Sequence, residues 1–290
     1  MELKIAIKAN NVLGEGPVWS VEENALYWVD IQEKLLQRWS PAREGIDIWR
    51  MPFEIGSFAL IHSGGCVVAL RTGLALLDLT NGEITPICDL EMDLPFTRFN
   101  DGKCDRQGRF WAGTMDEEYP NQRASLYRLD QDRSCEKIRG NVGISNGLGW
   151  SPDNKVFYYT DSTVNTIYAY DFDVENGNIS NERIFVEIPQ NYTPDGLTVD
   201  SDGFVWSAMW DGWKVVRFSP DGQVDKEIPL PVQRPTSCTF GGAKLNDLYI
   251  TSARINLTEE ELKKQPDAGS VLVFMTEVKG IPESKYRGGE

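Results

Sequence analysis

The amino-acid sequence predicts an all-β fold, a single six-bladed β-propeller domain spanning residues 1–290. Three observations predict it: a repeat of blade length, short β-rich runs separated by turn residues, and strand patterns at both ends of the chain. The repeat opens at Glu15, Ser57, Asn100, Asn146, Asp195 and Ser237. Successive openings are 42, 43, 46, 49 and 42 residues apart. A period of this length is typical of β-propellers, whose blades surround a central channel.

Short hydrophobic runs alternate with turn residues inside most repeats. In the first repeat Val18-Trp19 is followed by the aromatic run Ala25-Leu26-Tyr27-Trp28-Val29, which we expect to be the next strand of the blade. Pairs such as Asp101-Gly102 and Asp202-Gly203 separate the runs. These pairs mark turns between short strands. No low-complexity linker or change of composition divides the chain into domains.

Both ends of the chain carry a strand pattern. The N-terminal run Leu3-Lys4-Ile5-Ala6-Ile7 alternates, and the last repeat ends with Ser270-Val271-Leu272-Val273-Phe274. We expect the N-terminal strand to complete the last blade and close the ring, because pairing the two ends removes exposed sheet edges. One helix is predicted within the last blade at Thr258–Lys264, where Thr258 and Glu261 have the spacing of a capping box.

Composition restricts the class of protein. Hydrophobic residues make up 41% of the 290 residues, enough for one sizeable core. The net charge of −15 would repel a phosphate backbone, so a nucleic-acid partner is not expected. The sequence contains no apolar run of about 18 residues and its start lacks the pattern of a signal peptide. We therefore expect a soluble, cytoplasmic protein without a membrane partner, either a monomer or a weak homo-oligomer.

The cysteines suggest no disulfide or metal site. They number five, an odd count, and none forms a Cys-x-x-Cys pair. We expect them to be reduced thiols.

The six repeat-opening residues should lie close together, since the inner strands of a propeller all begin at one rim of the channel. Each carries a side-chain oxygen and none is apolar. Such a ring suits a hard divalent cation or a ligand with many hydroxyl groups. Asn, Asp and Ser are also common where strands leave turns, but Glu is depleted in strands, and Glu15 precedes the hydrophobic pair Val18-Trp19.

Several kinds of catalysis lack the residues they need. The single histidine, His62, lies in an expected hairpin turn, and the sequence contains no Gly-x-Ser-x-Gly elbow. A Ser-His-Asp hydrolase, a thiolate-histidine enzyme and a histidine-rich zinc site are therefore not expected. The glycine-rich motifs of nucleotide-binding proteins are also missing.

Six motifs resemble those of the regucalcin (senescence marker protein) and gluconolactonase family. They occur in the family's order between about Gly14 and Gly269, and are Gly14–Trp19, Arg98–Lys103, Ala112–Met115, Ser145–Leu148, Pro194–Gly196 and Thr236–Gly242. The resemblance implies a six-bladed propeller that binds one divalent metal ion in its channel and hydrolyses sugar lactones. By the same resemblance, the metal ligands are Glu15, Asn146 and Asp195. The residues that contact the sugar are Arg98, Asn100 and Glu118.

The assigned residues suit metal-dependent hydrolysis. Two carboxylates and one amide oxygen leave coordination positions open on a divalent ion for water and substrate. The oxygen ligands suit Ca²⁺ or Zn²⁺, and also Mg²⁺ or Mn²⁺. With no usable histidine, the general base must be a carboxylate, and Asp195 and Asp101 are the candidates. We favour Asp195.

The sequence thus favours a metal-dependent, gluconolactonase-like hydrolase. Its substrate would be an aldonolactone such as gluconolactone or xylonolactone, and its product the open aldonic acid. One alternative is a non-catalytic, calcium-binding regulatory protein of the regucalcin type. Another is a propeller that serves only as a protein-interaction scaffold, which would need no polar ring at the channel.

Overall fold

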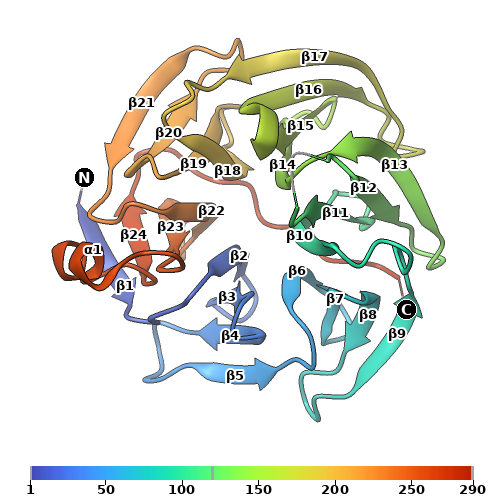
Figure 1. The fold of residues 1–290 in the computed structure, drawn as a ribbon, viewed down its shortest axis with the longest axis horizontal. Coiled ribbons are helices and arrows are strands. Elements are labelled where there is room, and N and C mark those ends of the chain that lie inside the picture. Colours follow the sequence, from blue (N-terminus) through green and yellow to red (C-terminus); the bar gives the residue numbers. More distant parts are fainter. Residues whose placement is uncertain (1, 119–120, 289–290) are drawn as a thin grey trace.

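Six four-stranded antiparallel sheets surround a central channel, which confirms the predicted six-bladed propeller (Figure 1). The computed structural model describes residues 2–118 and 121–288. In five sheets the four strands follow one another along the chain, whereas the sixth recruits the N-terminal strand.

The blades have the following strands, from the channel outward. Blade 1 contains β2 (Gly14–Ser20), β3 (Ala25–Asp30), β4 (Leu35–Trp39) and β5 (Asp47–Arg50). Blade 2 contains β6 (Ile55–Leu60), β7 (Cys66–Leu70), β8 (Gly73–Leu77) and β9 (Ile84–Cys88). Blade 3 contains β10 (Thr97–Cys104), β11 (Phe110–Asp116), β12 (Ala124–Leu129) and β13 (Cys135–Val142). Blade 4 contains β14 (Ser145–Trp150), β15 (Val156–Asp161), β16 (Thr166–Phe172) and β17 (Ile179–Glu187). Blade 5 contains β18 (Thr193–Val199), β19 (Val205–Trp210), β20 (Lys214–Phe218) and β21 (Val224–Pro229). Blade 6 contains β22 (Pro235–Gly241), β23 (Asp247–Ser252), β24 (Val271–Met275) and β1 (Leu3–Ile7).

The N-terminal strand closes the ring as predicted. β1 pairs antiparallel with β24, with Leu3 opposite Phe274 and Ile7 opposite Val271. The predicted helix is also confirmed: α1 (Glu259–Lys264) lies between β23 and β24 and has Thr258 as its N-cap. Among the described residues, no helix has the length and apolar composition needed to cross a membrane.

Burial follows the position of a strand in its blade. β3 and β7 are buried along their whole length, in agreement with their continuous apolar sequences. The outer strand β17 is mostly exposed. Neighbouring blades pack through large side chains, such as the rings of Trp206 and Phe240, whose centroids are 5.8 Å apart. The core is therefore a ring of inter-blade contacts around the channel.

Every inner strand contains a β-bulge at its repeat-opening residue. In blade 1, Glu15 lies opposite Val29 and Val18 lies opposite Tyr27, so β2 contains one residue more than β3 over this step. The inner strands of the other five blades show the same kind of irregularity. In β10 it includes Asp101-Gly102, so the expectation that this pair marks a turn between strands is wrong. A bulge interrupts the alternation of a strand and redirects its side chains. The repeated bulge therefore sets which side chains face the channel.

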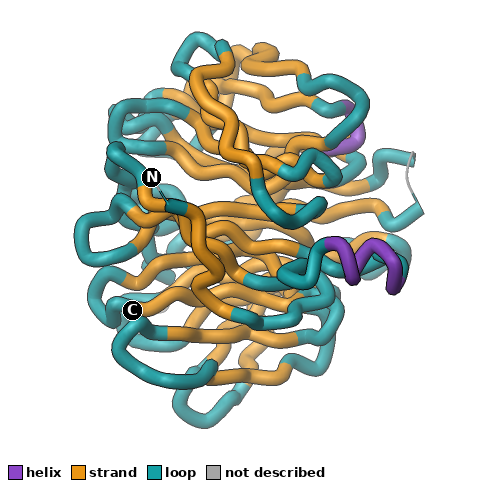
Figure 2. Tube along the Cα trace, turned by 90° about the vertical axis from the view of Figure 1, so that its left-hand side faces the viewer, coloured by secondary structure: helices purple, strands orange, loops and turns teal. Residues whose placement is uncertain are grey.

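The two faces of the disc differ. The inner strands begin at one face, here called the channel mouth, and end at the opposite one, here called the far face. α1 lies at the channel mouth, whereas the C-terminal end of the chain lies on the far face (Figure 2). Residues 279–287, here called the C-terminal strap, run across the far face toward blades 2 and 3 (Figure 1).

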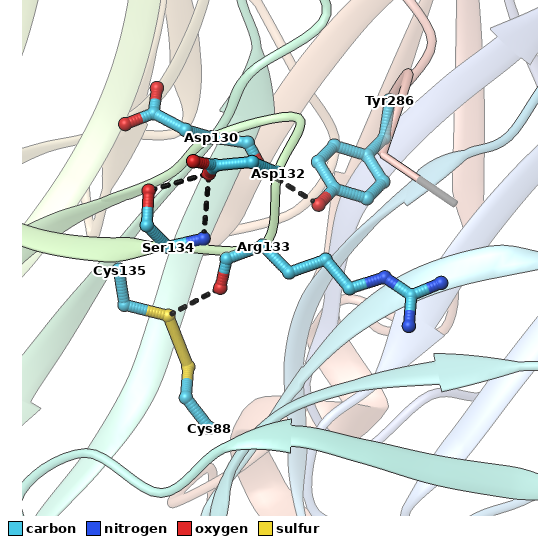
Figure 3. Close-up of a disulfide and its surroundings, with 7 residues drawn as sticks. All are labelled: Cys88, Asp130, Asp132, Arg133, Ser134, Cys135 and Tyr286. Atoms are coloured by element: carbon cyan, nitrogen blue, oxygen red, sulfur yellow. Dashed lines mark hydrogen bonds between the residues drawn. A yellow bond between two sulfur atoms is a disulfide. The ribbon is translucent and has the colours of Figure 1, made fainter. Parts of the chain in front are cut away.

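A disulfide joins Cys88 and Cys135, so the expectation that all five cysteines are reduced is wrong for this pair (Figure 3). Cys88 ends β9 and Cys135 begins β13, and the bond therefore links the outer strands of blades 2 and 3. The two cysteines are 47 residues apart in the sequence, and only the ring arrangement brings them together. The other three cysteines are free and buried.

The disulfide should stabilise the fold. Cross-linking a loop of 47 residues is worth about 2–4 kcal/mol. We expect Cys135→Ser to lower the free energy of unfolding in urea by this amount, and reduction of the parent protein to have the same effect. Thiol titration of the denatured, unreduced protein should find three free thiols, matching the three free cysteines. Five reactive thiols before reduction would contradict the assignment.

Candidate active site at the channel mouth

The six repeat-opening side chains are all buried. The repeat predicts that they lie close together, and Asn100 and Asn146 of neighbouring blades are hydrogen-bonded to each other. They come from the inner strands of all six blades, and are Glu15, Ser57, Asn100, Asn146, Asp195 and Ser237. Arg98, two residues before Asn100 in β10, and Asp101, which follows Asn100 in the bulge of that strand, are buried as well. Two amide and three carboxylate side chains, together with one guanidinium group, therefore surround one small region.

The three carboxylates differ in their hydrogen bonds. Glu15 Oε2 accepts a hydrogen bond of 3.0 Å from the Gly16 amide. Asp101 Oδ1 accepts one of 2.8 Å from the Gly102 amide. Asp195 Oδ1 is buried and has no hydrogen-bond partner among the described residues. A buried carboxylate oxygen without a partner is costly, so this atom indicates a missing donor or cation.

Burial is the largest cause that raises the pKa of all three carboxylates. Burial raises the pKa of Asp195 well above its usual range, and repulsion from Glu15 and Asp101 adds to the effect. Burial, with repulsion from Asp101, raises the pKa of Glu15 to about 8. Burial also raises the pKa of Asp101 to about 6, although the nearby Lys103 opposes the change. The site therefore favours an added positive charge, because a cation would relieve both effects.

A chain of amide hydrogen bonds fixes Asn146. Its Oδ1 accepts a bond of 3.1 Å from Asn100 Nδ2, and its own Nδ2 donates at 2.8 Å to Ser162 Oγ. Ser162 begins the short 3-10 helix η1 (Ser162–Val164) and donates at 2.7 Å to the Pro194 carbonyl. The Asn146 amide is thus held from both ends, and its oxygen lies on the side of Asn100.

Arg98 is buried beside these amides. Its Nη1 donates hydrogen bonds of 2.9 Å to the Phe99 carbonyl and to Asn100 Oδ1. Its Nε lies 3.6 Å from Glu117 Oε1 and donates no hydrogen bond among the described residues. Burial lowers the pKa of Arg98 to about 10, so the group stays charged at neutral pH. Arg98 therefore has donor capacity left for a ligand in the channel.

The loop after β11 places Glu117, rather than Glu118, beside Arg98. Glu117 also binds Arg71 through two hydrogen bonds of 2.8 and 3.0 Å. Glu118 is exposed and pairs with Arg123 at 3.2 Å. No sequence pattern pointed to Glu117 or Arg71. The sequence shows two adjacent glutamates, Glu117 and Glu118. Strand alternation could not tell which of them faces Arg98, because both lie after the end of β11.

Glycines allow the inner strands to approach one another at the site. A Cβ atom on Gly147 would lie 2.7 Å from the carbonyl oxygen of Asp195 in the neighbouring blade. A Cβ atom on Gly102 would lie 2.6 Å from Ser57 Oγ. Both distances are shorter than carbon–oxygen contacts allow. The glycines next to the repeat-opening residues are therefore needed to bring these side chains close together.

The residues present fit a divalent cation bound mainly by oxygen atoms. In residues 2–118 and 121–288, no group of three or more His, Cys, Asp and Glu side chains is arranged as a metal site. The expected ligand set does not require one, because it combines two carboxylates with the amide oxygen of Asn146. The unpartnered Asp195 Oδ1 and the raised carboxylate pKa values are the observations that favour a cation.

Comparison with known proteins gives a consistent result. The family model described as SMP-30/Gluconolactonase/LRE-like region matches residues 13–254. The 6-deoxy-6-sulfogluconolactonase of Pseudomonas putida is 40% identical over 288 residues, covering 99% of both chains. The regucalcin of Danio rerio is 39% identical over 293 residues, again covering 99% of both chains.

A solved structure agrees with the whole fold. The calcium-binding protein regucalcin from Agrobacterium tumefaciens superposes with a TM-score of 0.93 at 28% sequence identity. The match covers 98% of the present chain and 96% of the other.

The raised carboxylate pKa values predict how the metal-free protein responds to pH. Between the ordinary pKa of a glutamate, 4.5, and the raised value of about 8 for Glu15, the folded protein binds more protons than the unfolded chain. The free energy of unfolding should therefore fall as pH rises through this range. We expect the Tm of metal-free protein to be lower at pH 8.5 than at pH 5.5.

Asp195→Asn should flatten this pH dependence, because it removes one of the repelling charges. Ser237→Ala is the matched control, since Ser237 occupies the equivalent position in blade 6 and carries no charge. The control should keep the slope of the parent protein. A metal-free Tm that rises between pH 5.5 and 8.5 would contradict the proposed electrostatics.

Proposed function

The chain belongs to the SMP-30/gluconolactonase/LRE-like family, and we propose that it hydrolyses the ring ester of a sugar lactone with one divalent metal ion at the channel mouth. The substrate would be an aldonolactone such as gluconolactone or xylonolactone. The product would be the corresponding open-chain aldonic acid. Relatives that match along nearly the whole chain include a sugar lactonase, which supports this reaction class.

One observation carries the metal-dependent part of the proposal. Asp195 Oδ1 is buried without a hydrogen-bond partner among the described residues, next to two further carboxylates with raised pKa values. Glu15, Asn146 and Asp195 would hold the ion. The bound ion would act as a Lewis acid on the lactone carbonyl.

The chemistry of these ligands restricts the ion without selecting one. Oxygen ligands alone suit Ca²⁺, which the Agrobacterium relative is described as binding. Zn²⁺, Mg²⁺ and Mn²⁺ also accept two carboxylates and an amide oxygen. The set supplies two negative charges to the ion.

Arg98 and Asn100 would bind the sugar hydroxyls. Arg98 Nε has no hydrogen-bond partner among the described residues, and Asn100 lies between Arg98 and Asn146. Glu118 remains an expected sugar contact. It follows Glu117, the residue beside Arg98, in the loop after β11. Glu117 would instead hold the two arginines in place, since its carboxylate lies against both.

A carboxylate would act as the general base. It would accept a proton from the water that attacks the lactone carbonyl carbon, and the ring C–O bond would then break as the ring oxygen takes up a proton. Asp195 is favoured over Asp101, because as a ligand of the ion it would lie beside a water bound to that ion.

A second candidate function is that of a calcium-binding regulatory protein. The description of the Agrobacterium relative as a calcium-binding regucalcin favours it. The same three ligands would serve either function, so binding alone does not separate them. Turnover of a lactone does.

The direct test is acid release from gluconolactone and xylonolactone. Purified protein should release acid at a rate that a chelator abolishes and a divalent ion restores. Asp195→Asn should be nearly inactive, for want of a base, and Asp195→Ala should lose both bound metal and activity. Ser237→Ala, an uncharged change at the equivalent position of blade 6, serves as the control for folding.

A chelator-treated protein with full activity would overturn the metal dependence. A metal-loaded parent protein without lactone turnover would favour the regulatory function.

Asn100→Ala should weaken turnover and spare the metal. Losing one hydrogen bond to the substrate costs about 0.5–1.5 kcal/mol, or roughly a three- to tenfold fall in kcat/KM. Asn146 would still be held by Ser162, so metal content should stay at the parent level. Asn178→Ala, in the exposed turn before β17, is the control and should change neither quantity. Loss of metal from Asn100→Ala would reassign Asn100 as a ligand.

A further inference from the structure

We propose that the C-terminal strap is part of the active site: it seals the far end of the channel and, through Glu283, fixes the Lys103 ammonium group as the floor of the site. Lys103 and Glu283 are positioning residues in this proposal, because neither needs to touch the substrate. The effect on catalysis rests on the proposed function, whereas the seal itself does not.

The strap is attached to five blades. At its start, the Gly280 amide donates to the Leu245 carbonyl of blade 6, and the Ser201 amide of blade 5 donates to the Lys279 carbonyl. Lys285 forms an ion pair with Glu22 in blade 1.

Farther along, the strap is fixed to blades 2 and 3. The Tyr286 amide donates to the Leu60 carbonyl, and the Tyr286 hydroxyl donates at 2.9 Å to the Asp130 carbonyl (Figure 3). The Tyr286 ring is completely buried in the core between blades 2 and 3. A segment with a fully buried aromatic side chain is a fixed part of the fold rather than a loose tail.

Three inner strands meet at the Lys103–Glu283 pair. Lys103 of β10 pairs with Glu283 Oε1 at 3.0 Å, and Thr239 of β22 donates to the same oxygen at 3.1 Å. Lys103 Nζ also donates at 3.4 Å to the Leu197 carbonyl of β18. Because β10, β18 and β22 belong to blades 3, 5 and 6, atoms that all three reach must lie in the channel.

This cluster lies directly beneath the proposed catalytic side chains. Thr239 follows Ser237 by two residues in the regularly paired part of β22, and Lys103 is close enough to Asp101 for their charges to affect one another. Residues two apart in a strand point to the same side and are about 7 Å apart along it. The Lys103–Glu283 pair therefore lies about one side-chain layer below the carboxylates of the channel mouth.

The ion pair also fits the charge of the site. Burial disfavours the charged form of Lys103, but the attraction and hydrogen bond to Glu283, together with the attraction to Asp101, outweigh this effect and raise the lysine pKa. The side chains of Lys103 and Glu283 are only 16% and 11% exposed. Breaking a buried pair by removing one partner is strongly destabilising, so the pair holds the strap firmly in the channel.

Cys104 provides a reporter of the seal that is independent of catalysis. Its thiol is free and buried. It lines a cavity of about 40 Å³ together with Lys103, Ile281 and Glu283. Displacing the strap should therefore expose Cys104 to a thiol reagent, and labelling of the peptide that contains Cys104 can be followed by mass spectrometry. The peptide that contains Cys66, another buried free cysteine, measures general unfolding.

Gly280→Ala displaces the strap selectively. A Cβ atom at this position would overlap the Phe240 side chain, so the strap cannot keep its place. Gly140→Ala is the matched control, since a Cβ atom there meets nothing within 4 Å. In Gly280→Ala we expect the thiol reagent to label Cys104 at least about tenfold faster than in the parent protein, and to label Cys66 at the same rate as before. We also expect a fall in kcat of about tenfold with little change in KM. The control should change none of these.

Glu283 variants test the contact between the strap and Lys103 directly. Glu283→Gln keeps an oxygen for Lys103 and Thr239 but removes the charge of the pair, and should lower kcat and expose Cys104 less than Glu283→Ala does. Glu283→Ala removes that oxygen, and should lower kcat and expose Cys104.

Two results would overturn the proposal. Unchanged Cys104 labelling in both Gly280→Ala and Glu283→Ala would show that the strap is no seal. Faster labelling with an unchanged kcat would show that it covers the channel without supporting the site. If the parent protein hydrolyses no lactone, the proposed function fails, and Cys104 labelling still decides whether the strap seals the channel.

Discussion

The burial of three carboxylates in one small region is the interaction on which the rest of the structure depends. Glu15, Asp101 and Asp195 come from three blades and lie in the centre of a protein that already carries a net charge of −15. Burying like charges together costs folding free energy, which is expressed here as raised pKa values. A bound cation would relieve this repulsion, so metal binding would stabilise the folded protein.

The propeller supports this arrangement because its blades repeat one local device. The bulge in each inner strand lies at or next to its repeat-opening residue, and in blades 2 to 5 a nearby glycine lets the neighbouring strand approach. The six equivalent positions carry different side chains, and these would have different roles in the site. Charged or amide side chains in blades 1, 3, 4 and 5 would supply ligands and substrate contacts, whereas blades 2 and 6 contribute the small residues Ser57 and Ser237.

The features that recur in every blade could be predicted from the sequence, whereas single tertiary contacts could not. The period, the turn pairs and the alternation of Leu3–Ile7 were sufficient for the fold and its closure, because each depends on local patterning. The convergence of the opening residues followed from ring symmetry alone. The disulfide between Cys88 and Cys135 could not be predicted in this way, since it joins outer strands of two blades and its residues occupy no equivalent repeat positions. Glu117 and Glu283 were missed for a related reason: both lie outside regular strands, where side-chain direction depends on tertiary contacts.

The most direct test of the proposed site is to locate the metal itself. A crystal of the protein soaked in Mn²⁺ should show a single strong anomalous peak in the channel. The peak should lie about 2.0–2.6 Å from oxygen atoms of Glu15, Asn146 and Asp195, the range of metal–oxygen distances for hard divalent ions. A peak outside the channel mouth, or a channel mouth without metal in protein that hydrolyses lactones, would contradict the proposed site.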